Sequence, residues 1–89
     1  MVHINLHYVY LLKSTKANWT YIGQTGDLKQ RLTQHKVGQV RSTKGHLPLE
    51  LICYEAYNNA TDARKREIEL KTNSQQKEML LRRLETSLK

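Results

Sequence analysis

The sequence contains little that would cross-link the chain or place it in a membrane. Cys53 is the one cysteine among 89 residues, so an internal disulfide framework is excluded and a reducing environment is favoured. It lies in an apolar run, and we interpret it as a core residue rather than a nucleophile. No apolar run is long enough for a membrane span, and the first residues lack the apolar segment of a secretory signal. We therefore expect a cytoplasmic protein.

Internal repeats, low-complexity segments and linkers are also absent, which predicts one domain over residues 1–89. Phenylalanine is missing and tryptophan occurs once, but a hydrophobic content of 38% with five tyrosines suffices for a small core. Acidic residues are scarce: 8 Asp and Glu stand against 15 Lys and Arg, and the net charge is +7. This balance favours a polyanionic partner, first of all nucleic acid. Composition leaves open a basic surface with no specific partner.

Two apolar runs near the start predict an antiparallel hairpin. Residues 4–13 alternate as in a strand, and Val9 and Leu11 make its second half apolar on both faces, so we expect that half to be covered from both sides. Residues 14–18 are polar and resemble a turn. Residues 19–23 are rich in aromatic and β-branched side chains, which favours a second strand.

The rest of the chain predicts a helix, a strand and two more helices, which gives an α+β fold in the order β-β-α-β-α-α. The first helix starts at Gly26 and Asp27, runs to about Val37, and is closed by Gly38. A basic loop over residues 38–48 suits either phosphate contact or a plain connection. Residues 49–57 form the third strand. Asn59 or Thr61 caps a helix that reaches about Lys71, and Asn73 with Gln76 caps a last helix. The apolar stripe of that last helix predicts core packing: Met79, Leu80, Leu81, Leu84 and Leu88.

Two polar side chains of the first helix fall on its apolar side. At 100° per residue, Leu28 and Leu32 define the buried stripe, and Arg31 and His35 lie on it or beside it. A purely solvated arginine would sit on the opposite side of the helix. Arg31 either extends its guanidinium to the edge of the stripe or serves a site, and His35 is either structural or catalytic.

The second helix carries a carboxylate in a similar position. Glu67 lies four residues after Ala63 and three before Leu70, within a face that also includes Ala60. Burial of a carboxylate is costly unless a cation or a proton compensates it. The pattern predicts either a metal ligand or a buried ion pair, with Arg31 as the natural partner for the pair.

These residues together resemble the GIY-YIG nuclease superfamily. The resemblance rests on Tyr8-Val9-Tyr10, on Tyr21-Ile22-Gly23, on the helix with Arg31 and His35, and on Glu67 in a later helix. It covers about residues 7–84 and is closest to small stand-alone members. One departure is that Tyr8 replaces the first glycine of the first motif.

The resemblance implies a three-stranded antiparallel sheet flanked by helices, and an endonuclease that hydrolyses DNA with one divalent cation, Mg²⁺ or Mn²⁺. It implies low sequence specificity and a role in DNA repair, recombination or turnover. Members usually obtain targeting from further domains, so a partner protein is a possible source of targeting; the oligomeric state is left open. Matching positions assign site roles to Tyr10, Tyr21, Arg31, His35 and Glu67, with Glu67 as the metal ligand and Gly23 as the motif glycine.

Chemistry suggests a role for each site residue. We expect Tyr10 to act as the base and Tyr21 as its helper or as a donor that positions the phosphate. His35 would orient a tyrosine or take up the proton, and nearby cations would lower the phenol pKa. Arg31 would hold a phosphate oxygen. The residues expected to contact nucleic acid are Lys13, Trp19, Arg41 and Lys44, and Trp19 serves equally well as hairpin core.

Two other functions remain compatible with the sequence. One is a nucleic-acid-binding module that keeps the fold without cleavage, and the other is a nuclease subunit active only with a partner protein. A carboxylate in an apolar stripe has no purpose in a binding module, so the endonuclease is preferred.

Overall fold

A computed structural model describes residues 4–89 of the chain and shows a three-stranded antiparallel sheet. Its strands are β1 (His7–Ser14), β2 (Thr20–Thr25) and β3 (Leu49–Tyr57), in the spatial order β2-β1-β3. The central strand β1 is antiparallel to both neighbours. The α+β class and the order β-β-α-β-α-α are thus confirmed, while the first three residues of the expected domain lie outside the described part.

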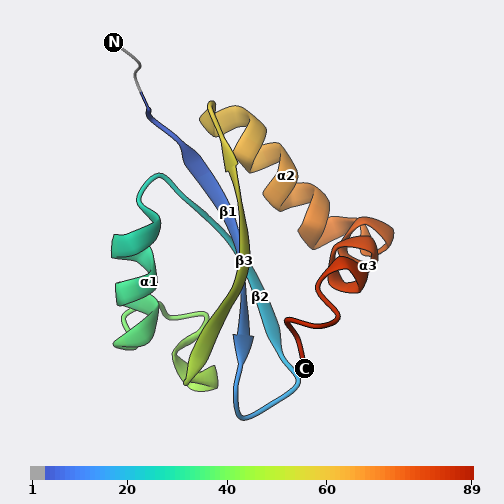
Figure 1. Cartoon of the computed structure of the whole chain (residues 1–89). Coiled ribbons are helices and arrows are strands. Elements are labelled where there is room, and N and C mark those ends of the chain that lie inside the picture. The colour runs from blue at the N-terminus through green and yellow to red at the C-terminus, as the bar shows by residue number, and fades with distance from the viewer. Residues whose placement is uncertain (1–3) are drawn as a thin grey trace.

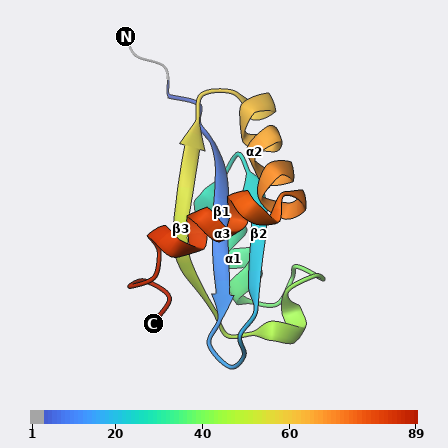
Figure 2. The ribbon, with the colours of Figure 1, turned by 90° about the vertical axis from the view of Figure 1, so that its right-hand side faces the viewer.

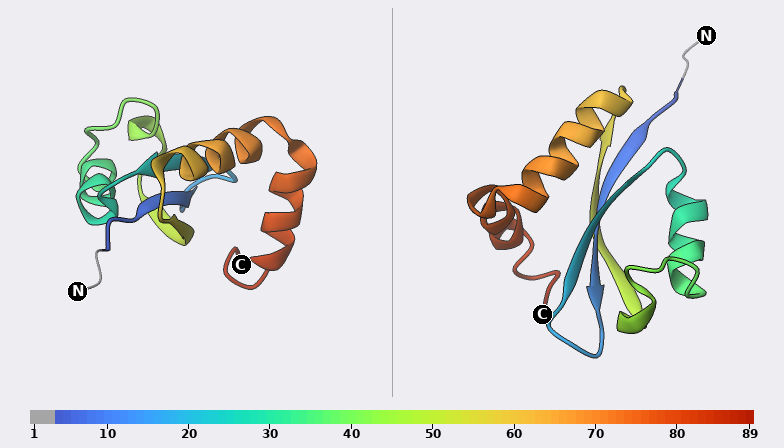
Figure 3. Two further views of the ribbon diagram at one scale, coloured as in Figure 1. Left: turned by 90° about the horizontal axis from the view of Figure 1, so that it is seen from above. Right: turned by 180° about the vertical axis from the view of Figure 1, so that it is seen from behind.

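Helices cover the sheet on both faces (Figure 1). The helix α1 (Leu28–Lys36) lies on one side, and α2 (Ala60–Thr72) and α3 (Ser74–Arg83) lie on the other. Seen from the second side, α3 crosses in front of the strands (Figure 2), and the same layers appear from above and from behind (Figure 3). The expected two-sided cover of β1 is confirmed.

The alternation of β1 divides the buried residues into two groups. Val9 and Leu11 belong to the apolar core beneath α2 and α3. Its other buried members are Ile22, Ala63, Leu70 and Leu80. The buried residues on the α1 side are partly polar: Ser14, His35, Thr43 and the hydroxyl-bearing Tyr10 are buried there together with the apolar Leu12 and Val40. The buried polar side chains therefore lie on the α1 face of the sheet, and the apolar core lies on the face covered by α2 and α3.

The boundaries of the hairpin strands differ from the prediction. Ile4 is 78% exposed and precedes β1, so the predicted start of that strand at residue 4 was wrong. The second strand begins one residue late and continues to Thr25, because Gly23 and Gln24 pair with Tyr10 and Val9 instead of breaking the strand. The third strand has its predicted bounds.

Capping side chains determine where the helices begin. Asp27 accepts a hydrogen bond from the backbone N–H of Gln30 at the start of α1, and Asn59 accepts one from Thr61 at the start of α2. Asn73 likewise caps α3. Gly38, with φ of 79°, follows the end of α1 as predicted, in the left-handed region that favours glycine.

Some details of the helices were predicted wrongly. Ala60 is exposed, and Met79 is 50% exposed although it was assigned to the core stripe. The loop at residues 38–48 contains a short 3₁₀ helix, η1 (Lys44–His46). Among residues 4–89, none of the helices is both long enough and apolar enough to cross a membrane.

Candidate active site

The site is built around the ring of Tyr10, which lies over a glycine of the neighbouring strand. Tyr10 pairs with Gly23 across β1 and β2, so both residues face α1. A Cβ atom at Gly23 would overlap Cζ and the hydroxyl oxygen of Tyr10. Tyr10 is 1% exposed. The motif glycine is therefore required because the tyrosine ring occupies the place of its side chain.

A chain of polar contacts leads from Tyr10 into the loop after α1. The hydroxyl oxygen of Tyr10 lies 2.8 Å from Nε2 of His35. The other ring nitrogen, Nδ1, lies 2.8 Å from Oγ1 of Thr43. His35 is 2% exposed and Thr43 is fully buried. The expectation that His35 orients a tyrosine agrees with this geometry.

Burial sets the charge states of this pair. Burial raises the pKa of Tyr10, although the Arg31 guanidinium opposes this by favouring the phenolate. The expected effect of a cation is present, since Arg31 acts to lower the phenol pKa, but desolvation outweighs it and the Tyr10 pKa is raised overall. Burial and, after it, the charge of Arg31 lower the pKa of His35. At neutral pH the structure holds a neutral phenol against a neutral imidazole.

Tyr21 forms the more open side of the site. Its ring centroid lies 6.4 Å from that of Tyr10 and 5.5 Å from that of His35. Unlike Tyr10, Tyr21 is only half-buried. The ammonium of Lys71, from α2, lies 5.6 Å from the Tyr21 ring centroid, within range of a cation–π interaction. Tyr21 thus connects the α1 side of the site to α2.

Glu67 reaches the site from α2 as a partly buried carboxylate. Its side chain is 22% exposed, and its Oε2 lies 3.3 Å from Nζ of Lys71. The alternative of an ion pair with Arg31 is not found, since no salt bridge joins the two residues within residues 4–89. Arg31 instead donates to Oε1 of Gln34 at 3.0 Å. The charge of Glu67 nevertheless contributes to raising the Tyr10 pKa, after burial.

The donor set suits a divalent cation held by one protein ligand. Among the described residues no group of three His, Cys, Asp or Glu side chains could hold a metal ion. A carboxylate oxygen is the ligand that Mg²⁺ and Mn²⁺ prefer, and Mg²⁺ commonly keeps several waters and takes further oxygens from substrate phosphates. Glu67 fits such a site and does not fit a closed metal cage.

The residues expected to contact nucleic acid fall into two groups. Arg41 and Lys44 are exposed on the loop that carries Thr43, close in sequence to the His35 partner. Trp19 stacks on His46 with ring centroids 3.6 Å apart, which joins the hairpin to this loop. Lys13 is three residues after Tyr10 in a regular strand, so its side chain belongs to the opposite face. The structure does not bring Lys13 to the site.

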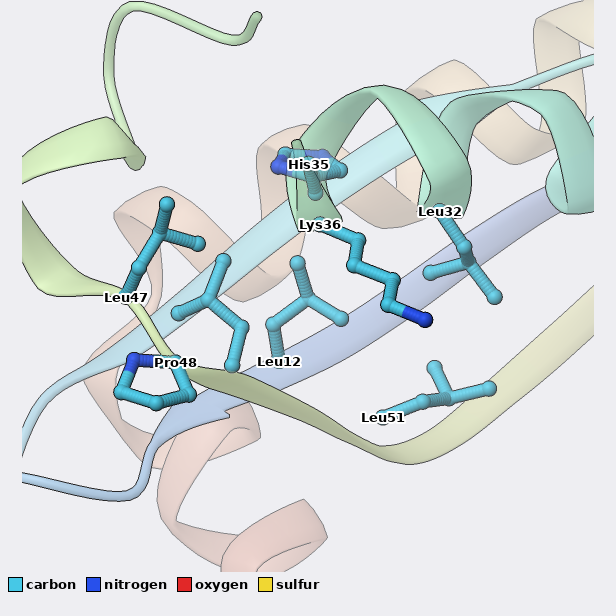
Figure 4. Close-up of a pocket in the computed structure, with 8 residues that line it drawn as sticks. Leu12, Leu32, His35, Lys36, Leu47, Pro48 and Leu51 are labelled. Atoms are coloured by element: carbon cyan, nitrogen blue, oxygen red, sulfur yellow. The ribbon is translucent and has the colours of Figure 1, made fainter. Parts of the chain in front are cut away.

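A pocket on this face of the sheet borders the candidate site at His35. A pocket of about 510 Å³ between α1 and β3 is lined largely by apolar side chains, with His35 and Lys36 at the helix (Figure 4). Tyr8, the departure from the motif, packs edge-on against Tyr54 with centroids 5.7 Å apart, on the β3 side of Tyr10. Its side chain contacts Tyr54 rather than Tyr10 or His35.

Two residues near the site were not predicted. Lys71 follows Glu67 by four residues on one helix, a spacing that could have indicated an ion pair. Thr43 lies in an irregular loop, where no periodicity signals burial. Its contact with His35 depends on how the loop folds back over α1, which the sequence pattern does not show.

The chain is similar to known proteins in sequence and in fold. The family model described as the GIY-YIG catalytic domain matches residues 6–80. UPF0213 protein SSP2268 of Staphylococcus saprophyticus is 37% identical over 76 residues, which are 84% of this chain and 92% of that protein. A UPF0213 protein of Staphylococcus aureus is 36% identical over the same coverage. The solution NMR structure of UPF0213 protein BH0048 from Bacillus halodurans has a TM-score of 0.55 and 31% identity, covering 89% of this chain and 84% of that one.

Proposed function

The chain belongs to the GIY-YIG family of nucleases, and on this basis we propose that it is a divalent-metal-dependent endonuclease that hydrolyses phosphodiester bonds in DNA. The observation that carries the proposal is the pairing of a buried phenol and imidazole, Tyr10 with His35, on the same site as the carboxylate of Glu67. Hydrolysis requires a proton acceptor for water and compensation of phosphate charge. The site offers both.

The phenols and His35 form a route for the proton of the attacking water. Tyr21 is the phenol with access to solvent, and Tyr10 is the one with an acceptor behind it, His35 Nε2 at 2.8 Å. The raised pKa of Tyr10 excludes a standing phenolate at neutral pH. The phenol therefore acts by accepting a proton while passing its own to His35. The lowered pKa of His35 keeps the imidazole free to receive it.

Positive charge close to the phenols suits the phosphate. Arg31 influences both Tyr10 and His35 electrostatically, which supports placing the reacting phosphate beside its guanidinium. A guanidinium binds phosphate oxygens through two parallel hydrogen bonds. Arg41 and Lys44, exposed on the adjacent loop, extend the positive surface along the DNA backbone.

Glu67 would hold Mg²⁺ or Mn²⁺, which supplies Lewis acidity at the leaving oxygen when it is bound. Lys71 lies 3.3 Å from the same carboxylate, so this ammonium competes for Glu67 in the free protein.

The contacts proposed here are all to the backbone of DNA, which favours low sequence specificity and a role in DNA repair, recombination or turnover. A targeting partner protein would then select the substrate, and a cytoplasmic location agrees with the single unpaired cysteine.

A cleavage screen tests the proposal. The purified protein is incubated with branched, single-stranded and plain duplex DNA, with Mg²⁺ or Mn²⁺ and with EDTA. We expect metal-dependent strand breaks in at least one substrate. Arg31→Gln and Tyr10→Phe are expected to reduce them, whereas Arg82→Gln, at an exposed pair on α3, is the control expected to have no effect.

Adding cell extract separates the remaining functions. Cleavage that appears only with extract and disappears in Glu67→Gln would identify a subunit that needs a partner. Binding without cleavage under all conditions, with no effect of Glu67→Gln, would identify a binding module and contradict the proposal.

A further inference from the structure

The imidazole of His35 has both ring nitrogens engaged, so its tautomer matters. A neutral imidazole carries one N–H and one lone pair, and the hydrogen bond made by one nitrogen decides what the other presents. Nε2 lies 2.8 Å from the Tyr10 hydroxyl and Nδ1 lies 2.8 Å from Oγ1 of Thr43. Whether Oγ1 of Thr43 accepts from Nδ1 or donates to it therefore determines whether Nε2 presents a lone pair or an N–H group to Tyr10.

The available acceptors favour one tautomer. Oγ1 of Thr43 donates to the backbone carbonyl of Val40 at 3.4 Å, which leaves a lone pair of the hydroxyl to accept from Nδ1–H. Nε2 is then a lone pair that accepts from the Tyr10 hydroxyl. Each of the three polar protons has an acceptor in this arrangement.

The opposite tautomer leaves one buried proton without a partner. With Nε2–H donating to Tyr10, the hydroxyl proton of that tyrosine would need a second acceptor. Within residues 4–89 the hydrogen-bond acceptor beside the Tyr10 hydroxyl is His35, because the other side chain that interacts with this hydroxyl, Arg31, can only donate. An unsatisfied buried donor costs about 1–3 kcal/mol, which disfavours this state.

We propose that Thr43 is a positioning residue for DNA cleavage: it holds His35 in the Nδ1–H tautomer and so keeps the Nε2 lone pair on Tyr10. The catalytic part of this inference rests on the proposed function, while the tautomer itself does not. Thr43 is fully buried, and the stack of Trp19 on His46 ties its loop to the hairpin, so the hydroxyl is held in place.

The lone pair has a defined use in the proposed reaction. As water attacks the phosphorus, a new P–O bond forms and the P–O bond to the leaving oxygen breaks, so that this oxygen departs on the cut DNA strand with the bonding electron pair. The O–H bond of the water breaks in the same step, and its proton goes to the Tyr10 oxygen. The former Tyr10 proton goes to Nε2, where a new N–H bond forms. His35 becomes an imidazolium, and its Nδ1–H remains hydrogen-bonded to Oγ1 of Thr43. In the Nε2–H tautomer this transfer has no acceptor, so Tyr10 has nowhere to pass its proton.

Nitrogen NMR of the free protein tests the tautomer directly. Long-range ¹H–¹⁵N spectra distinguish the N–H nitrogen of a neutral imidazole from the nitrogen with the lone pair. We expect Nδ1 of His35 to be the N–H nitrogen in the wild type, and Thr43→Val to populate Nε2–H. Thr43→Ser, which keeps the hydroxyl, is expected to retain the wild-type pattern. A wild-type spectrum with Nε2–H would overturn the inference even if no variant folds.

Cleavage kinetics test the consequence. Thr43→Val is expected to lower kcat by about 10-fold to 100-fold, by analogy with the residues that orient a metal-ligating histidine, with KM for DNA unchanged. Thr43→Ser is expected to restore kcat, and Ser42→Ala, on the exposed neighbour, serves as the control. Equal losses in Thr43→Val and Thr43→Ser would overturn the positioning role. A wild type that cuts no DNA would contradict the proposed function and leave the NMR test of the tautomer intact.

Discussion

At the scale of single residues, the site depends on one close approach between two strands. Tyr10 and Gly23 are direct partners in the β1–β2 register, and the tyrosine ring fills the space above the glycine. The same ring places its hydroxyl 2.8 Å from His35. The hydroxyl can take this position because Gly23 has no side chain, and a larger residue there would displace the tyrosine ring.

Gly23→Ala tests this dependence. The added methyl group overlaps the Tyr10 ring, so we expect a loss of about 1–3 kcal/mol in the free energy of unfolding, the usual cost of overpacking. Displacement of the hydroxyl is expected to lower kcat by about 10-fold or more. Urea denaturation and cleavage assays measure the two effects. Gly45→Ala is the matched control, because a Cβ atom there meets nothing within 4 Å; equal effects in both variants would refute the account.

At the scale of elements, a polar cluster joins β3 to both helices of the apolar face. Arg66 of α2 donates to both carboxylate oxygens of Glu55 on β3, at 2.9 and 3.1 Å, and to Glu69 and Gln76. Tyr57 donates to the same Glu55 at 2.6 Å. These contacts link β3, α2 and α3 beside the apolar core. They help to hold α2, the helix that carries Glu67, against the sheet.

Arg66→Met is expected to destabilise the fold by about 1–3 kcal/mol at neutral pH, since it leaves a partly buried carboxylate without its charged partner. Burial alone would raise the pKa of Glu55, but hydrogen bonds from Arg66 and Tyr57 lower it overall. A lowered pKa gives stability above the ordinary glutamate value and loses it as the pH falls through the folded value. The difference between variant and wild type should therefore shrink below about pH 4.

Urea denaturation at several pH values measures this difference. Arg82→Met is the control, because Arg82 and Glu78 are 77% and 63% exposed and such pairs contribute about 0–1 kcal/mol. If the two variants lose equal stability, or if the loss in Arg66→Met is independent of pH, the cluster has no such role.

Local sequence signals predicted the elements better than their contacts. The third strand has its predicted bounds, and Asn59 and Asn73 cap the helices they precede, because strand pattern and capping are local properties. The placement of His35 on the buried side of α1 also followed from helical periodicity. In contrast, Thr43 was missed, because its contact with His35 depends on a loop that folds back over α1. The pair of Glu67 with Lys71 was also missed, although its spacing of four residues on one helix is a local signal.

At the scale of the whole molecule, the two faces of the sheet have different tasks. The apolar core beneath α2 and α3 stabilises the fold, and the α1 face holds the buried polar groups of the site. Glu67 belongs to α2, on the face with the apolar core, but it serves the site on the α1 face because α2 lies alongside β2. Lys71 extends from the same helix to the ring of Tyr21. The complete site therefore requires both layers.

Metal affinity follows from this architecture. With one carboxylate and a lysine competing for it, the free protein is expected to bind Mn²⁺ weakly, with no saturation at micromolar metal. DNA supplies phosphate oxygens, so its addition should tighten binding. Electron paramagnetic resonance of Mn²⁺ measures both states, and Lys71→Met is expected to strengthen binding to the free protein. A tight site without DNA would contradict the account.

The central claim is that Glu67 serves phosphodiester cleavage rather than folding or DNA binding. The most direct measurement is the rate of DNA cleavage by Glu67→Gln beside that by the wild type, on the best substrate and at saturating Mg²⁺. The account predicts that kcat falls by about 100-fold or more, since metal-borne charge stabilisation contributes several kcal/mol, while DNA affinity and the unfolding midpoint are retained. Cleavage by Glu67→Gln at the wild-type rate would contradict it.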